Sequence, residues 1–259
     1  MNTTIAGSLL RRAVRRPEAR QRLFCFPHAG GAASTFRTWP DRLPGAVELV
    51  TAQYAGREDR MDVPMRDTMS GLVADIVEEM APLADVPFAL FGHSMGAAVA
   101  YEVALALRLR GMRQPTQLFV SAREAPDLAR GGTVHLRDDD GLCAELIRLG
   151  GTTEEVLAHR EMRELILPMV RNDYRLIETY EPTAADALEC PITVLRGDAD
   201  PEVTSEEALA WRARTRGRFE VVVFPGDHFY LVGQRDTVLA LLAHRLGVES
   251  LARKGHQQP

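Results

Sequence analysis

The sequence predicts an α/β fold with a mainly parallel central sheet flanked by helices. Six short runs are rich in apolar residues, and several are apolar almost throughout, as expected for strands buried on both faces. Longer stretches with helical spacing of apolar side chains alternate with these runs. The length of 259 residues suits one large domain, or one domain with an insertion, and is too short for two ordinary α/β domains.

The strands and helices of this sheet can be assigned in order along the chain. The apolar runs predict strands over 22–26, 47–54, 88–92, 117–122, 192–197 and 219–224. Helical spacing predicts helices over 70–83, 96–110 and 236–246. Gly111 and Gly247 follow the last two helices, and a glycine just past the last periodic residue is a common helix end.

The segment from about 123 to 182 departs from this alternation, because it contains no convincing strand. Its pattern predicts three helices instead, at about 138–149, 153–160 and 160–180. Pro168 lies inside the third helix and is expected to kink or split it. We interpret the segment as a helical insertion that covers one edge of the sheet.

The remaining features concern the ends of the chain and its charge. Residues 1–20 are expected to form a flexible tail and residues 251–259 a disordered one, which leaves 21–250 as a single domain. The net charge of −5 argues against general nucleic-acid binding. The sequence contains neither a signal peptide nor an apolar run of the ~20 residues that a membrane-spanning helix needs.

The cysteine pattern predicts neither disulfides nor a zinc site. Cys25, Cys143 and Cys190 are widely spaced and odd in number, and no CxxC pair occurs, which fits a protein of the reducing cytoplasm. HExxH, EF-hand and GxxxxGK[ST] motifs are also missing from the sequence. We therefore expect no metal and no nucleotide cofactor.

The stretch "GHSMG", Gly92–Gly96, indicates a nucleophilic serine. It follows a predicted strand and precedes a predicted helix, which is the context that gives a Gly-x-Ser-x-Gly motif its meaning. The sharp turn would expose the Ser94 hydroxyl above the carboxyl end of the sheet. It would also aim the backbone N–H of Met95, at the start of the helix, towards an oxyanion.

A serine nucleophile needs a base, and the chain order of α/β-hydrolases places that histidine last. The histidines after Ser94 are His135, His159, His228, His244 and His256. The first two fall in the helical insertion, and the last two fall in the final helix and the tail. His228 follows the last predicted strand, where a loop reaches the carboxyl edge of the sheet, so we predict that it is the base.

The acid that orients the base should follow an earlier strand. The stretch "RGDADPEV" offers Asp198, which is nearer the strand end, and Asp200, which precedes Pro201. Spacing does not choose between these two carboxylates. Asp227 is adjacent to His228, and adjacent residues rarely orient each other in this way.

A second oxyanion donor is expected in the loop after the first strand, "FPHAGGAAS". Gly30 and Gly31 allow a tight backbone path there, and the small residues leave room for a substrate carbonyl. We predict that the N–H of Ala29 completes the oxyanion hole with that of Met95. His28 is interpreted as a structural residue of this loop rather than a second base.

Five stretches in this order carry a resemblance to a known family. They are "FCFPHAGGAASTFRTW", "AQYAGREDRMD", "FALFGHSMGAAVAYEVA", "VLRGDADPEV" and "FPGDHFYL". Together they resemble the type II, stand-alone thioesterases of polyketide and nonribosomal peptide assembly lines. The resemblance spans about residues 20–245.

The resemblance implies an α/β-hydrolase fold with a mobile helical lid, which corresponds to the insertion at 123–182. It implies hydrolysis of acyl thioesters on the phosphopantetheine arm of acyl or peptidyl carrier proteins, which removes aberrant acyl groups. The acid of the family is the second aspartate of its GDxDP motif, which is Asp200 here. No cofactor is implied, because the phosphopantetheine belongs to the substrate.

Two other functions share the predicted triad or the predicted fold. One is a general carboxylesterase or lipase that acts on free small-molecule esters, and the other is a non-catalytic binding protein with a hydrolase fold. Since carrier proteins are typically acidic, an enzyme of net charge −5 should meet one through a local basic or apolar patch. Arg57, Arg60 and Arg66 are candidates for that patch, as are the arginines near the N-terminus, although a solvated charged face is the more common role of such residues.

Overall fold

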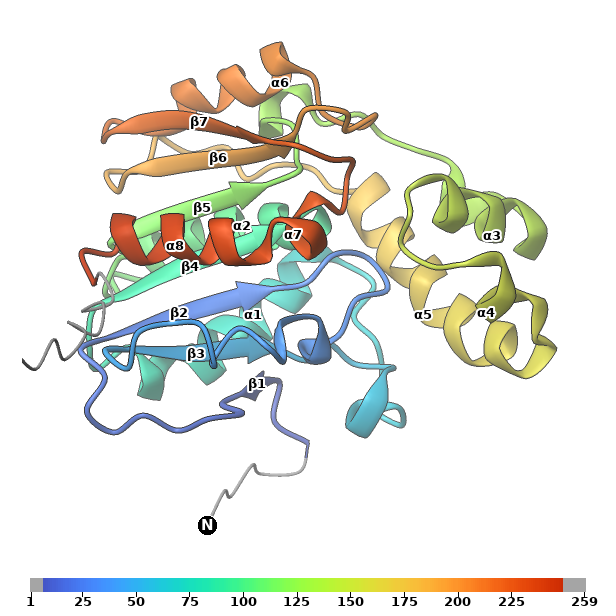
Figure 1. The fold of residues 1–259 in the computed structure, drawn as a ribbon, viewed down its shortest axis with the longest axis horizontal. Coiled ribbons are helices and arrows are strands. Elements are labelled where there is room, and N and C mark those ends of the chain that lie inside the picture. The colour runs from blue at the N-terminus through green and yellow to red at the C-terminus, as the bar shows by residue number, and fades with distance from the viewer. Residues whose placement is uncertain (1–6, 249–259) are drawn as a thin grey trace, which may run out of the picture.

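The computed structural model describes residues 7–248, and within them seven strands form one sheet (Figure 1). The strands are β1 (Leu10–Arg11), β2 (Gln21–Phe26), β3 (Val47–Ala52), β4 (Phe88–His93), β5 (Gln117–Ser121), β6 (Ile192–Gly197) and β7 (Phe219–Phe224). Their order across the sheet is β1-β3-β2-β4-β5-β6-β7. Every neighbouring pair is parallel except β1 and β3, which are antiparallel.

Helices cover both faces of the sheet. The α-helices are α1 (Met69–Met80), α2 (Met95–Leu109), α3 (Asp139–Arg148), α4 (Glu154–Ala158), α5 (Arg160–Glu178), α6 (Ser205–Ala210), α7 (Tyr230–Gly233) and α8 (Arg235–Arg245). Helices α1 and α2 lie on one face and α8 crosses the other (Figure 1). The predicted α/β-hydrolase fold, with a mainly parallel sheet between helices, is confirmed.

The core explains why the strands are largely apolar. Along β2, Phe24 and Phe26 pack into the cluster under α1 and α2, whereas Leu23 and Cys25 pack into the cluster under α8. Successive side chains of a strand point to opposite faces, so a strand covered on both sides is apolar at most of its positions. The predicted helix over 160–180 is also present, as α5, and it runs through Pro168 without being split. Pro168 is exposed, so water can satisfy the carbonyl that loses its partner.

The prediction of a flexible tail over residues 1–20 is wrong for residues 7–20. Leu10 in β1 pairs with Ala52 of β3, and Leu9 is buried in the core. The Arg16 guanidinium donates hydrogen bonds to the carbonyls of Leu43, Pro44 and Val47. A two-residue strand among arginines leaves no periodic pattern that sequence reasoning could detect. Residues 1–6 and the tail at 251–259 lie outside the described residues.

Three helices of the predicted insertion, α3, α4 and α5, lie beyond the carboxyl ends of the strands (Figure 1). We call them the cap helices. They enclose an apolar cluster of their own, separate from the two clusters of the sheet: Leu142, Cys143, Leu157, Leu167 and Val170. Among the described residues, no helix combines the length and the apolar character needed to cross a membrane.

Candidate active site

A sharp backbone turn carries Ser94 at the junction between β4 and α2. Ser94 has a φ of 55° and a ψ of −119°, a conformation that residues with a side chain rarely adopt. A Cβ on Gly92 would lie 2.0 Å from the carbonyl oxygen of Gly96. A Cβ on Gly96 would lie 2.0 Å from the carbonyl oxygen of Phe26 at the end of β2. The two glycines therefore allow the strand, the helix and the neighbouring strand end to approach closely around the serine.

The backbone on both sides of the nucleophile candidate is fixed by hydrogen bonds. The Ser94 N–H donates to the Ser121 carbonyl at the end of β5, at 2.8 Å, and the Ser94 carbonyl accepts from the Ala97 N–H at 2.9 Å. Met95 is the first residue of the 15-residue helix α2. Its N–H belongs to the first turn, whose amides have no partner within the helix and favour negative charge.

His228 and Asp200 meet at the carboxyl ends of β6 and β7. These strands are parallel neighbours, so the loops that follow them leave the sheet side by side. Nδ1 of His228 lies 3.1 Å and 3.2 Å from the two carboxylate oxygens of Asp200. Both residues are buried, with 3% and 8% of their surface exposed. A carboxylate that accepts from Nδ1 fixes the imidazole tautomer and leaves Nε2 available for proton transfer.

The other two aspartates of these loops have structural partners instead. Asp198 accepts a hydrogen bond from the Gly226 N–H at 2.9 Å, and Asp227 accepts one from the Phe229 N–H at 2.9 Å. The structure thus brings Asp200, and not Asp198, to His228. The two aspartates are two residues apart in one loop, which is why spacing alone left the choice open.

The loop after β2 approaches the turn that carries Ser94, because β2 and β4 are neighbours in the sheet. We call residues 28–31 the oxyanion loop. The Gly31 N–H donates to the His28 carbonyl at 2.9 Å and closes a turn, and Gly30 has a φ of 78°. Ala29 lines the same cavities as Ser94 and His228. The predicted second donor is therefore located beside the predicted nucleophile and base.

Two cavities open at this point, and Ala29, Ser94, Tyr174 and His228 line both. The first, of about 160 Å³, is lined mainly by apolar side chains of the cap helices, among them Leu146, Leu157, Ile166, Met169 and Val170. The second, of about 230 Å³, is lined by many charged side chains, among them Arg123, Glu124, Arg130, Glu178, Glu202 and Glu207. The site thus has an apolar arm and a polar arm, with the serine where they meet.

A buried polar group behind the base was missed by sequence reasoning. Nδ1 of His93 lies 2.9 Å from the Ser121 hydroxyl, which lies 2.6 Å from the Tyr230 hydroxyl. The ring of His93 is 5.3 Å from that of His228. Burial, and secondarily the neighbouring His228 and His28, hold the pKa of His93 well below its usual value. His93 is therefore a neutral residue of the core and not a second acid. Its position inside "GHSMG", next to Ser94, was the one sequence feature that could have indicated its place near the site.

His28 also remains neutral at physiological pH. Burial, followed by the charges of His228 and Arg57, lowers its pKa to about 3. A group with that pKa is a poor general base near neutrality, which argues for the structural interpretation.

Cys25, Cys143 and Cys190 are all free and buried. Among residues 7–248, no three side chains of His, Cys, Asp or Glu are grouped so that they could hold a metal ion.

The suggestion that Arg57 and Arg60 form a docking patch is wrong. They are 2% and 8% exposed, because their side chains turn inwards from the loop after β3. Arg57 pairs with Asp173, and Arg60 donates to the Gly7 carbonyl. Only Arg66 of the three is exposed, and it pairs with Asp75. Nothing in the charge pattern of the sequence distinguished these inward-facing arginines from solvated ones.

Comparisons with known proteins show the family to which the chain belongs. Residues 21–246 match the model of the thioesterase domain family. A probable cadicidin biosynthesis thioesterase of Streptomyces griseus is 44% identical over 87% of this chain, which spans 62% of the length of that relative.

Two solved structures are similar along their whole length. The type II thioesterase BorB from the borrelidin biosynthetic cluster has a TM-score of 0.86 and 39% identity, over 94% of this chain and 99% of that one. YbtT, a type II thioesterase from the yersiniabactin NRPS/PKS pathway, has a TM-score of 0.84 and 29% identity, over 93% and 100%. The chain belongs to the thioesterase domain family and is a thioester hydrolase, as its resemblance to type II thioesterases implied.

Proposed function

We propose that this thioesterase hydrolyses acyl thioesters on the phosphopantetheine arm of carrier proteins and so removes aberrant acyl groups from a polyketide or nonribosomal peptide assembly line. The observation that carries the proposal is the convergence of Ser94, His228 and Asp200 at the junction of an apolar and a polar cavity. The relatives named above, which act in the biosynthesis of such products, support the choice of substrate.

In the proposed acylation step, Nε2 of His228 removes the proton from Ser94 Oγ as that oxygen attacks the thioester carbon. The tetrahedral intermediate collapses, the C–S bond breaks, and His228 returns the proton to the departing pantetheine thiol. Asp200 keeps the imidazole oriented and stabilises the imidazolium. Water activated by His228 then cleaves the acyl-serine ester. No cofactor takes part, because the phosphopantetheine enters with the substrate.

The N–H groups of Met95 and Ala29 are proposed to stabilise the oxyanion of both tetrahedral intermediates. Each is a backbone donor whose position is set by neighbouring backbone, so no donor has to reorganise during the reaction. The loss of one such donor costs about 10²–10³ in turnover in comparable hydrolases.

The two cavities suggest how the substrate lies. The apolar arm under the cap helices is suited to the acyl group, and the polar arm is suited to the amides of the pantetheine. Within a single domain that includes β1, we propose that the insertion at about 123–182 acts as a lid that excludes water from the acyl-enzyme.

The test is release of acyl groups from an acylated carrier protein, followed by intact-protein mass spectrometry. Wild type, Ser94→Ala and a control, Ser70→Ala at the exposed start of α1, are compared, with the same acyl group on free pantetheine as a second substrate. Ser94→Ala should lose at least about 10⁴-fold in rate, and the control should match wild type. Ser94-dependent release that shows no preference for the carrier would instead indicate a general small-molecule hydrolase.

A further inference from the structure

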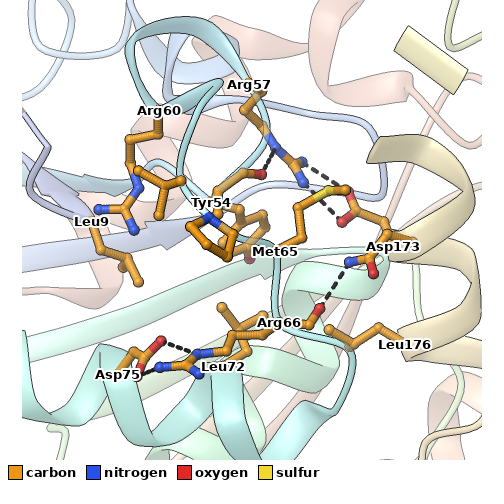
Figure 2. Close-up of a pocket in the computed structure, with 14 residues that line it drawn as sticks. Leu9, Tyr54, Arg57, Arg60, Met65, Arg66, Leu72, Asp75, Asp173 and Leu176 are labelled. Atoms are coloured by element: carbon orange, nitrogen blue, oxygen red, sulfur yellow. Dashed lines mark hydrogen bonds and ion pairs between the residues drawn. The ribbon is translucent and has the colours of Figure 1, made fainter. Parts of the chain in front are cut away.

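A buried ion pair joins the cap helix α5 to the loop that follows β3 (Figure 2). Nη1 and Nη2 of Arg57 each lie 2.8 Å from a carboxylate oxygen of Asp173, which makes the pair bidentate. Arg57 is 2% exposed and Asp173 is 3% exposed. A charge pair this deeply buried holds its partners in one geometry, because any displacement leaves an uncompensated charge in the interior.

The same two side chains hold the oxyanion loop. Oδ2 of Asp173 accepts a hydrogen bond from the Gly30 N–H at 2.8 Å. Nη1 of Arg57 donates to the Gly31 carbonyl at 2.7 Å. The ion pair therefore fixes the N–H of Gly30 and the carbonyl of Gly31 by hydrogen bonds, immediately after Ala29.

The Gly30 N–H belongs to the peptide plane that joins Ala29 to Gly30. Since a peptide unit is planar, a hydrogen bond that fixes this N–H also fixes the backbone of Ala29 on its carboxyl side. The turn closed between His28 and Gly31 restrains the other side. Together they leave little freedom for the direction of the Ala29 N–H.

Helix α5 also contacts the loop sterically. A Cβ on Gly30 would lie 2.9 Å from Cγ2 of Val170. Val170 and Asp173 are three residues apart on α5 and so share one face of the helix. That face meets the oxyanion loop directly, with an apolar contact and a charged hydrogen bond.

We propose that Asp173 is a positioning residue for the oxyanion hole, so that the hole is formed only when α5 is docked on the loop. The inference rests on the proposed function, in which Ala29 supplies one of the two donors. Asp173 acts through Gly30 and need not touch the substrate. Its effect is expected on the transition state rather than on substrate binding, because the oxyanion develops only there.

The test measures hydrolysis of S-acetyl-pantetheine, a short substrate with little acyl chain to contact the cap, and inhibition by a trifluoromethyl ketone whose adduct with Ser94 carries an oxyanion. Asp173→Asn should lower kcat about 10- to 10²-fold with KM changed less than about twofold. Affinity for the ketone should fall by the same factor as kcat/KM. Asp140→Asn is the control, because Asp140 pairs with Arg163 within the cap and should leave both quantities unchanged.

A double variant guards against loss of folding. Arg57→Met with Asp173→Leu replaces both buried charges with apolar side chains, so neither charge is left unpaired, and it also removes the acceptor of the Gly30 N–H. It should fold and show at least the kcat loss of Asp173→Asn. If either folded variant keeps the wild-type kcat and affinity for the ketone, Asp173 only anchors the cap and the inference is overturned. Retained hydrolysis by Ser94→Ala would instead overturn the proposed function.

Discussion

The two walls of the active site are built in different ways. On the sheet side, Ser94, Asp200 and His228 stand on short loops at the ends of strands that are packed on both faces. On the cap side, the wall comes from three helices around a small apolar cluster of their own. The proposed catalytic groups are thus carried by the larger core, and the side chains proposed to receive the acyl group are carried by the smaller one.

The links between the two walls are also unequal. The Arg57–Asp173 pair is buried, whereas the pair between Arg148 of α3 and Glu202, two residues after Asp200, has side chains that are 45% and 39% exposed. Exposed pairs contribute about 0–1 kcal/mol to stability, because water and salt screen them. The α5 side of the cap is therefore expected to be held more firmly than the α3 side.

The largest effect should come from the sheet wall. Asp200→Asn is expected to lower kcat by roughly 10⁴-fold, because the imidazole loses the carboxylate that fixes its tautomer. Asp198→Asn should keep most of the activity, since Asp198 only accepts from the Gly226 N–H. Steady-state kinetics of the two variants make the comparison. Equal losses would show that the acid has been assigned to the wrong aspartate.

A large-to-small substitution in the apolar cluster of the cap helices should show that the cap and the sheet differ in stability. Leu142 of α3 is fully buried, and Leu142→Ala should lower the stability of the cap by about 2–5 kcal/mol. Hydrogen exchange should then accelerate in α3, α4 and α5 while β4 and β5 stay protected.

The matched control for this substitution is Leu118→Ala in β5, at a residue that is also fully buried. It should accelerate exchange in the sheet and the cap together, because the cap depends on the sheet for its place. If Leu142→Ala accelerates exchange equally in both regions, the cap and the sheet are one cooperative unit and the distinction drawn above is lost.

The smallest effect concerns pH. The pKa of His93 is held well below 6.5 when the chain is folded, so between these values the unfolded chain binds a proton that the folded chain does not. Its contribution to stability is complete above the unfolded pKa and is lost as the pH falls. The slope should reach up to about 1.4 kcal/mol per pH unit. Urea unfolding between pH 7 and 5 should show a shallower slope for His93→Gln; an unchanged slope would place the acid sensitivity elsewhere.

The same contrast separates what could be predicted from the sequence from what could not. Apolar runs and helical spacing are local signals, and they located the predicted strands of the sheet and the three cap helices to within about two residues. The Gly-x-Ser-x-Gly motif around Ser94 is also a local signal. The contact between Arg57 and Asp173 joins residues 116 positions apart, and each of them looks in the sequence like an ordinary solvated charge. No periodicity reports such a pairing.

The choice of acid was intermediate in difficulty. Residue spacing placed both Asp198 and Asp200 in the right loop, and the family resemblance favoured Asp200. The structure adds the reason: Asp198 is occupied with the backbone of the next loop, which leaves Asp200 to face His228. A side chain that organises a loop and one that pairs with a histidine can have the same residue type and nearly the same position.

The close approach of the loops after β6 and β7 has a consequence for motion. A Cβ on Gly197 would lie 2.3 Å from the carbonyl oxygens of both Gly226 and Asp227, and the Ala199 N–H donates to the Gly226 carbonyl at 3.0 Å. Because the two loops are in direct backbone contact, each restrains the movement of the other. We therefore expect the loops that carry Asp200 and His228 to be displaced together, so that the distance between the two side chains is kept when the structure around them moves.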